Sequence, residues 1–371
     1  MPMLAESIRL TVGGVVNERW SGWSVDSDLL IASDAFELEL HTEQGGALPA
    51  EVAEGAPCQL QLGEDTVLTG RLDEVEHEVS RSSHTVRITG RDLAGFLVDC
   101  STPFVSMRDA SLQQIVDQVA KPLGIDRVRL QVPGGALRRR VQIQPGQSAW
   151  EVLLQVAEAS GAWPWVEPDG TLVVGGPDYA AAPVGRLQLR HDGEGNTITR
   201  ISVRRSIAQR YSQITVLGQH GAFDGNDWGN NRTTLKAQAK DDALARRGIF
   251  RPRVVVDGAC DSNSLADSRA KKLLADSLME GFEARVIVPG WRASGGVVWA
   301  PGQRVELLSE PHGLHGVYFV MGRTLRLTRA QGAITELRLR EDRAWIIGEP
   351  IAKGKARKRK PKSADDGEQY L

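Results

Sequence analysis

The chain has 371 residues, of which 41% are hydrophobic and 25% are charged, and its formal net charge is -2. This length predicts two to four domains with ample material for buried cores, and the composition is typical of a soluble globular protein. No apolar run approaches the ~18 residues that a membrane-spanning helix needs. Residues 1–10 lack the basic and apolar regions of a signal peptide. We therefore expect synthesis in a cytoplasm and no membrane insertion.

Motifs that would indicate an enzyme are missing from the sequence. Cys58, Cys100 and Cys260 are far apart, so neither a disulfide framework nor a zinc-binding pair is predicted. His312 and His315 are close in sequence but have no further residues nearby at metal-ligand spacing. The sequence has no nucleophile elbow, phosphate-binding loop or dinucleotide fingerprint. We expect no metal, no cofactor and no catalytic activity.

The first 98 residues are predicted to form a small antiparallel β-barrel. Apolar and polar residues alternate in runs such as 8–12 and 36–40, and glycine pairs separate the runs. Alternation with a period of two is typical of strands that bury one face. Residues 1–98 are therefore assigned to a first β-barrel domain.

Residues 99–183 are predicted to form a small α+β domain. Ser111 with Gln114, and Ser148 with Glu151, have the spacing of helix capping boxes, and apolar residues follow each pair at helical intervals. A hairpin is expected around residues 168–170, since Pro-Asp-Gly favours a turn.

Strand patterns return after residue 184, stop, and return again near residue 282. Residues 224–231 are polar, residues 235–247 have the composition of a helix, and Ser264 is placed to cap a longer helix. We therefore predict a second β-barrel domain that is interrupted by an inserted α/β domain. The barrel takes residues 184–223 and 285–346, and the insertion takes residues 224–284.

Two distant stretches, residues 55–92 and 301–342, resemble each other. Each contains an alternating strand, a short turn, a run with a Gly-Arg pair, and a final alternating strand. The similarity predicts two related β-barrels within one chain.

Two groups of residues are candidates for contacts with partners. Trp163 and Trp165 flank a proline; such aromatic side chains anchor protein interfaces when exposed, and core packing is an equal alternative. Residues 347–371 have a basic run without apolar periodicity, which predicts a disordered tail that binds nucleic acid, binds an acidic partner, or only aids solubility. The basic residues of this tail are Lys353, Lys355, Arg357, Lys358, Arg359, Lys360 and Lys362.

A longer pattern lies in residues 141–174. They read V-x-I-x-P-G-x-S-A-W-x-x-L-x-x-V-A-x-x-x-G, and then D-G-T-L-V-V. This pattern resembles the second domain of baseplate hub proteins from Mu-like tailed phages, the late control protein D-like group, and is similar to the hub part of type VI secretion spike proteins. The order of domains also matches, over about residues 4–346.

The resemblance implies a structural baseplate hub of a contractile phage tail. Hubs of this group are homotrimers, so two similar barrels per subunit give six near-equivalent barrels around a channel. The ring would join the sixfold tail tube protein to the threefold central spike protein, with a tape-measure protein or DNA in the channel. Such an adaptor needs large interfaces, above ~2,000 Å², and closed symmetry. The protein would be made in the host bacterium's cytoplasm and would reside in the tail baseplate of the virion.

Two alternatives remain from the sequence. Residues 141–174 also resemble a LysM module, which would make the chain a peptidoglycan-binding or cell-wall-cleaving tail protein, although the second LysM helix is missing. The chain could also be an effector-loading spike of a secretion system. Such spikes continue into a long β-helix, whereas this sequence ends soon after the second predicted barrel, which favours a separate spike subunit.

Overall fold

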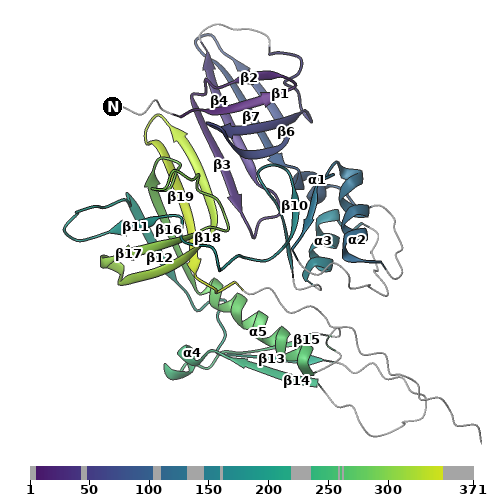
Figure 1. The fold of residues 1–371 in the computed structure, drawn as a ribbon, viewed down its shortest axis with the longest axis vertical. Coiled ribbons are helices and arrows are strands. Elements are labelled where there is room, and N and C mark those ends of the chain that lie inside the picture. The colour runs from purple at the N-terminus through teal and green to yellow at the C-terminus, as the bar shows by residue number, and fades with distance from the viewer. Residues whose placement is uncertain are drawn as a thin grey trace, which may run out of the picture.

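The computed structural model describes residues 6–42, 48–102, 110–131, 146–158, 162–218, 235–257, 260 and 263–345. In these residues the chain is mostly β, as predicted, and one 13-stranded sheet runs through two modules. Figure 1 shows the first β module at the top, the second at the left, an α+β domain at the right, and an inserted unit below. One apolar core continues through both β modules.

The first β module contains seven strands whose inward residues alternate with outward residues, as in β7, where nearly every second side chain is buried. The strand order is β2-β1-β5-β6-β7-β4-β3. The strands are β1 (Ile8–Val12), β2 (Val15–Asn17), β3 (Gly22–Asp28), β4 (Ala35–Thr42), β5 (Pro57–Leu62), β6 (Asp65–Val79) and β7 (His84–Asp92).

The second β module has the strand order β11-β17-β18-β19-β16-β12. Its strand β18 also pairs with β3, which joins the two modules edge to edge. The strands are β11 (Arg186–Leu189), β12 (Arg200–Arg205), β16 (Phe282–Pro289), β17 (Arg304–Ser309), β18 (Leu314–Thr328) and β19 (Gly332–Glu341).

Two closed barrels, as predicted from the sequence, are not confirmed. In the part of the chain that the structure describes, the sheet is open, and no strand pair closes either module on itself. The edge strand β3 pairs with β18 of the other module instead. Alternation of apolar and polar residues specifies which face of a strand is buried, but it does not specify which strand lies at its edge.

The α+β domain has its own apolar core, in which two helices pack against a small sheet of order β8-β10-β9. Both predicted capping boxes form: Ser111 with Gln114, and Ser148 with Glu151. Residues 141–145, which begin the sequence pattern of residues 141–174, lie outside the described residues. The elements are α1 (Ala94–Asp99), α2 (Leu112–Ala120), the short helix Lys121–Leu123, β8 (Val128–Leu130), α3 (Ala149–Glu158), β9 (Trp163–Val166) and β10 (Leu172–Gly175).

The inserted unit is larger than predicted and starts earlier. Strand β13 pairs with β14 and β15 and not with the large sheet, so the boundary at residue 224 is too late. The prediction of a helix over residues 235–247 is also wrong, because the first half of this range forms strand β14. There Leu235, Ala237 and Ala239 face inward at every second position, and pairing with β13 overrides their helix propensity. The elements are β13 (Gln213–Gly218), β14 (Leu235–Lys240), α4 (Asp242–Arg246), β15 (Pro252–Asp257) and α5 (Asn263–Glu280).

The two β modules share one topology. In chain order, β1, β3, β4, β5, β6 and β7 correspond to β11, β12, β16, β17, β18 and β19, and the pairing order is the same in both sets. The pairs match in direction except for the outermost one, since β1 pairs with β5 antiparallel whereas β11 pairs with β17 parallel. The insertion lies between β12 and β16, which corresponds to the connection between β3 and β4.

Local details of the two modules also coincide. Strands β6 and β18 each have 15 residues, and each has a register shift, after Leu72 in one and after Val320 in the other. The amide of Gly55 donates to Leu72 O at 2.8 Å, and the amide of Gly302 donates to Val320 O at 2.9 Å. Leu72 therefore corresponds to Val320. The sequence comparison matched the pair Gly70-Arg71 with the pair Gly322-Arg323. In the structure Arg71 corresponds to Phe319, so that match is four positions out of register.

Glycine at position 90 is required by close packing at the centre of the first module. A Cβ there would lie 2.5 Å from Cζ of Phe36 and closer still to the carbonyl oxygen of Arg71. We expect Gly90→Ala to lower the free energy of unfolding by ~1–3 kcal/mol, as overpacking does. Gly316→Ala, in β18 with nothing within 4 Å of the new methyl group, is the matched control. Equal urea midpoints for the two variants would contradict this assignment.

Candidate assembly interface

The contact between β3 and β18 is the first interface that the structure provides, and we call it the module seam. It runs antiparallel from Asp28 opposite Gly322 to Trp23 opposite Leu327. Because strand pairing satisfies backbone hydrogen bonds on both edges, the two modules are held in one fixed register.

An arginine fork fixes one face of the module seam. Arg338 on β19 donates from Nε to Asp28 Oδ2 at 2.8 Å and from Nη1 to Asp26 Oδ1 at 2.9 Å. Its Nη2 donates to the carbonyl oxygen of Ser27 at 3.0 Å. These ion pairs raise the pKa of Arg338 despite its burial. Arg338 therefore holds β3 in place through three separate hydrogen bonds.

The core face of the seam holds two tryptophans and an arginine. Trp23 and Trp291 come from different modules, and their ring centroids are 4.9 Å apart. Trp291 Nε1 donates to Arg326 O at 3.1 Å. Arg323 is only 1% exposed and donates to the carbonyl oxygens of Val25 and Val67, at 3.3 and 3.4 Å. Burial lowers the pKa of Arg323 to about 10.

Two carboxyl groups, those of buried Asp92 and partly buried Asp34, lie where both modules meet the α+β domain. Asp92 accepts from Ser33 Oγ at 2.6 Å and from the amide of Ala94 at 3.0 Å. Asp34 accepts from the amide of Asp28 at 3.2 Å. Burial raises the pKa of Asp34 to about 6, and burial together with the charge of Asp34 raises the pKa of Asp92 to about 8. A hollow of about 190 Å³ lies beside this pair.

This pair predicts an unusual dependence of stability on pH. The pKa of an aspartate in the unfolded chain is ~3.9. At pH values between this pKa and the raised pKa values of the folded chain, the folded state binds more protons than the unfolded state. Stability therefore falls as pH rises through this range. At pH above 8 we expect Asp92→Asn to raise the free energy of unfolding by at least ~1 kcal/mol, since one pKa unit corresponds to ~1.36 kcal/mol.

The measurement is urea denaturation at several pH values between 4 and 9. Asp99→Asn is the control, because Arg91 lowers the pKa of that exposed carboxyl, so its removal should give no gain. An Asp92→Asn variant that is less stable than wild type at pH 8.5 would contradict the assignment.

Trp163 makes its contacts within the chain. Its Nε1 donates to Leu29 O at 2.6 Å, and its ring meets Trp345 edge-on with centroids 6.0 Å apart. Trp345 is itself buried, and Tyr179 donates to its carbonyl oxygen at 2.8 Å. This cluster holds the α+β domain against the second β module. Trp165 is half-buried at the edge of the hollow beside Asp34.

The basic residues predicted to contact a partner lie outside the described residues. Arg323, Arg338 and Trp345 were not predicted as site residues from the sequence. A signal for Arg323 was present, because it occupies an inward position of an alternating strand, where an apolar side chain is expected.

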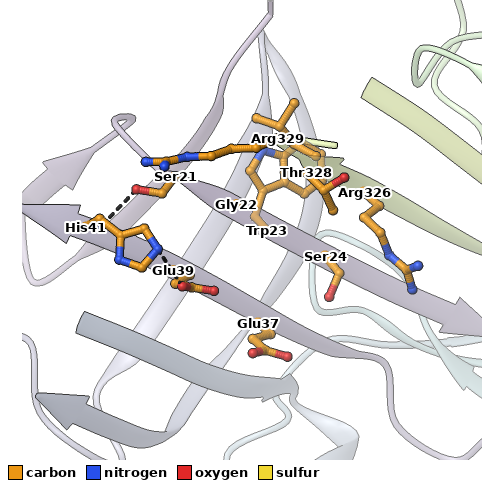
Figure 2. Close-up of a pocket in the computed structure, with 11 residues that line it drawn as sticks. Ser21, Gly22, Trp23, Ser24, Glu37, Glu39, His41, Arg326, Thr328 and Arg329 are labelled. Carbon is orange, nitrogen blue, oxygen red and sulfur yellow. Dashed lines mark hydrogen bonds and ion pairs between the residues drawn. The ribbon is translucent and has the colours of Figure 1, made fainter. Parts of the chain in front are cut away.

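A shallow hollow of about 260 Å³ lies on the outer surface of the module seam. Its lining comes from both modules, namely β3 and β4 of the first and the end of β18 of the second (Figure 2). His41 Nε2 lies 2.8 Å from Glu39 Oε1, and the amide of His41 donates to Ser21 Oγ at 2.8 Å. In the described residues no group of three or more His, Cys, Asp or Glu side chains is arranged to hold a metal ion.

No helix among the described residues is both long and apolar enough to cross a lipid bilayer.

Four family models match successive parts of the chain. They are described as Mu phage baseplate assembly protein GpP-like, N-terminal (residues 7–92); baseplate hub protein gp44-like, second domain (94–176); tail protein NMB1110-like, third domain (210–274); and tail protein, C-terminal domain (276–344). The third match begins before β13, in agreement with the earlier start of the inserted unit.

The solved tail protein from Neisseria meningitidis MC58 is similar along nearly all of the chain. It is 33% identical with a TM-score of 0.80, and the alignment covers 92% of this chain and 98% of that protein. The chain belongs to the Mu-like family of phage baseplate hub and tail proteins.

Other members of the family agree with this assignment. The baseplate hub protein gp44 of Escherichia phage Mu is 22% identical over 93% of this chain and 90% of its own length. The 43 kDa tail protein of prophage MuSo2 from Shewanella oneidensis is 25% identical with a TM-score of 0.79, covering 92% of this chain and 99% of that protein. As a member of the Mu-like baseplate hub family, the chain is a structural protein of the virion tail.

Proposed function

We propose that this hub protein is a homotrimer that adapts the sixfold tail tube to the threefold central spike around a channel. The observation that carries the proposal is the repetition of one six-strand pairing order in the two β modules of a single chain. Three chains with two matching modules each present six similar surfaces, and a threefold ring can then contact a sixfold ring without mismatch.

Rigid coupling of the two modules supports this role. The module seam combines strand pairing, the arginine fork of Arg338 and the Trp23–Trp291 contact, so the modules are fixed relative to each other. A symmetry adaptor needs this rigidity, because a flexible link between modules would not present six surfaces at regular angles. The α+β domain and the inserted unit extend away from the sheet and are available for other contacts, including those with the spike (Figure 1).

Light scattering of the purified full chain tests the proposal. At micromolar concentration we expect three times the chain mass of 40.4 kDa. A strictly monomeric or dimeric mass over the whole concentration range would refute the trimeric adaptor. The tail tube protein, the spike protein and a tape-measure protein or DNA in the channel are the partners proposed for the trimer, with the basic tail and Trp165 as candidate contacts.

The alternative functions have less support. In the described part of residues 141–174, helix α3 is followed by the β9–β10 pair, and Leu172, Val173 and Val174 of β10 are buried. That strand therefore offers no surface to a sugar chain, and we expect no retention of the protein on purified peptidoglycan. A solved type VI secretion component from E. coli shares 11% identity with a TM-score of 0.54, which is a likeness of fold alone.

A further inference from the structure

Two of the strand edges of the large sheet that lack a partner in the described residues are six residues long, longer than the free edges of β2 and β11. One is β12, which pairs only with β16 and ends the sheet. The other is the second half of β6, from Glu74 to Val79, which pairs only with β7, because β5 stops pairing at Arg71. Val79 is 67% exposed, and Ile207, just after β12, is 39% exposed. Unpaired edges are ready to accept another strand.

The chain itself shows what these edges fit. By the correspondence of the modules, β12 matches β3, and the second half of β6 matches the part of β18 that begins at Gly322. Within the chain β3 pairs with that part of β18 at the module seam. The matching pair, β12 with β6, is not made within the chain, because the two strands lie far apart in the strand order of the sheet. A neighbouring copy can supply the missing partner.

Transfer of the seam's register to the two free edges predicts which residues meet. Asp26 faces Thr324 at the seam, and the matching positions are Arg204 and Glu76. Trp23 faces Leu327, and the matching positions are Ile201 and Val79. The transferred register therefore places an arginine opposite a glutamate on one face and two apolar residues opposite each other on the other face.

The charges of the two edges are complementary. Strand β12 carries Arg200, Arg204 and Arg205, whereas Glu74, Glu76 and Glu78 project from one face of β6. Opposite charges directly across a strand pair contribute ~0.2–1 kcal/mol each, and like charges oppose pairing. Each edge is therefore repelled by a second copy of itself and attracted by the other edge, which favours head-to-tail association.

The present contacts of these charges are weak enough to be exchanged. Glu76 lies 3.6 Å from Arg87 in an ion pair with both side chains about half exposed. Arg205 lies over the Phe282 ring at 5.6 Å. An exposed ion pair contributes ~0–1 kcal/mol and an exposed cation–π contact ~0.5–1 kcal/mol, so little is lost when a neighbouring strand arrives.

We propose that β12 of one copy pairs antiparallel with the second half of β6 of the next copy, and that this contact repeats the module seam between chains. The inference rests on the proposed trimer and names the surface that closes it. A head-to-tail contact forms a ring when its rotation closes, and six equivalent seams, three within chains and three between them, complete that ring.

Charge reversal tests the surface. We expect Arg204→Glu and Glu76→Arg, each in the full chain, to raise the trimer dissociation constant at least tenfold by light scattering, and we expect the double variant to recover most of the loss. Glu64→Arg in the β5–β6 turn and Arg246→Glu on α4 are exposed controls that should leave the mass unchanged. Unaltered far-ultraviolet circular dichroism spectra of the variants would show that the fold is intact.

A disulfide tests the register independently. Glu78 and Ser202 occupy the positions that match Arg326 and Ser24, which face each other at the seam. In a Cys100→Ser background, Glu78→Cys with Ser202→Cys should give covalent trimers on a non-reducing gel, and neither single cysteine should. A wild-type trimer that shows no charge effect and no cross-link overturns this inference but leaves the proposed function standing. A wild type that is not a trimer overturns both.

Discussion

Trp23→Ala is expected to destabilise the chain more than any other substitution considered, by ~3–5 kcal/mol, which is the usual cost of removing a buried tryptophan. Trp23 is 4% exposed and lies on β3, between its own module and Trp291 of the other. Its loss opens a cavity at the seam and removes the aromatic contact between modules. Urea denaturation followed by circular dichroism measures the loss.

Two further variants separate seam packing from a general effect of losing an aromatic ring. Trp23→Phe keeps a ring against Trp291 and should retain most of the stability. Trp165→Ala removes a half-buried side chain of the α+β domain that takes no part in the Trp23–Trp291 contact, and it should cost less. A loss below ~1 kcal/mol for Trp23→Ala would mean that the two modules do not share a core, since even a modest buried truncation exceeds that value.

Arg338→Ala is expected to have the second largest effect. We expect the free energy of unfolding to fall by ~2–4 kcal/mol, because the substitution leaves partly buried carboxylates without their positively charged partner. The side chains of Arg338 and Asp28 are 17% and 11% exposed, so the loss of the guanidinium leaves Asp28 without its partner in a poorly solvated place. Arg338→Lys should recover only part of the loss, because an ammonium group cannot reproduce the fork.

The surface ion pair of Arg9 with Glu18 provides the control for Arg338. Those side chains are 45% and 40% exposed. Arg9→Ala should therefore change the free energy of unfolding by less than ~1 kcal/mol. Adding Asp28→Asn to Arg338→Ala should restore stability, since it removes the negative charge that was left without a partner. If the double variant is less stable than Arg338→Ala alone, the fork is not an electrostatic clamp on β3.

Much of the fold was predictable from local patterns. Alternation located the strands of both β modules, and the capping boxes at Ser111 and Ser148 located two helices, because these signals depend only on neighbouring residues. The similarity of residues 55–92 and 301–342 also proved to be a true repeat of topology, although its register was several residues out in the second strand.

Features that depend on distant partners were not predictable. The edge of β3 looks the same in sequence whether it closes its own module or pairs with β18, and the structure shows the second arrangement. Strand β14 has helix-forming residues and is a strand only because β13 lies beside it. The pair of partly buried Asp34 and buried Asp92 brings together residues 58 positions apart, and nothing in the sequence near either residue indicates this pair.

In the proposed hub, two matching modules fixed at one seam let a threefold assembly present sixfold surfaces. An electron-microscopic reconstruction of the isolated full chain, computed without imposed symmetry, tests it most directly. We expect a ring with a central opening and six lobes of similar size, joined alternately by intrachain and interchain seams. A compact particle without an opening, or a ring with only three lobes at the level of the large sheet, would contradict it.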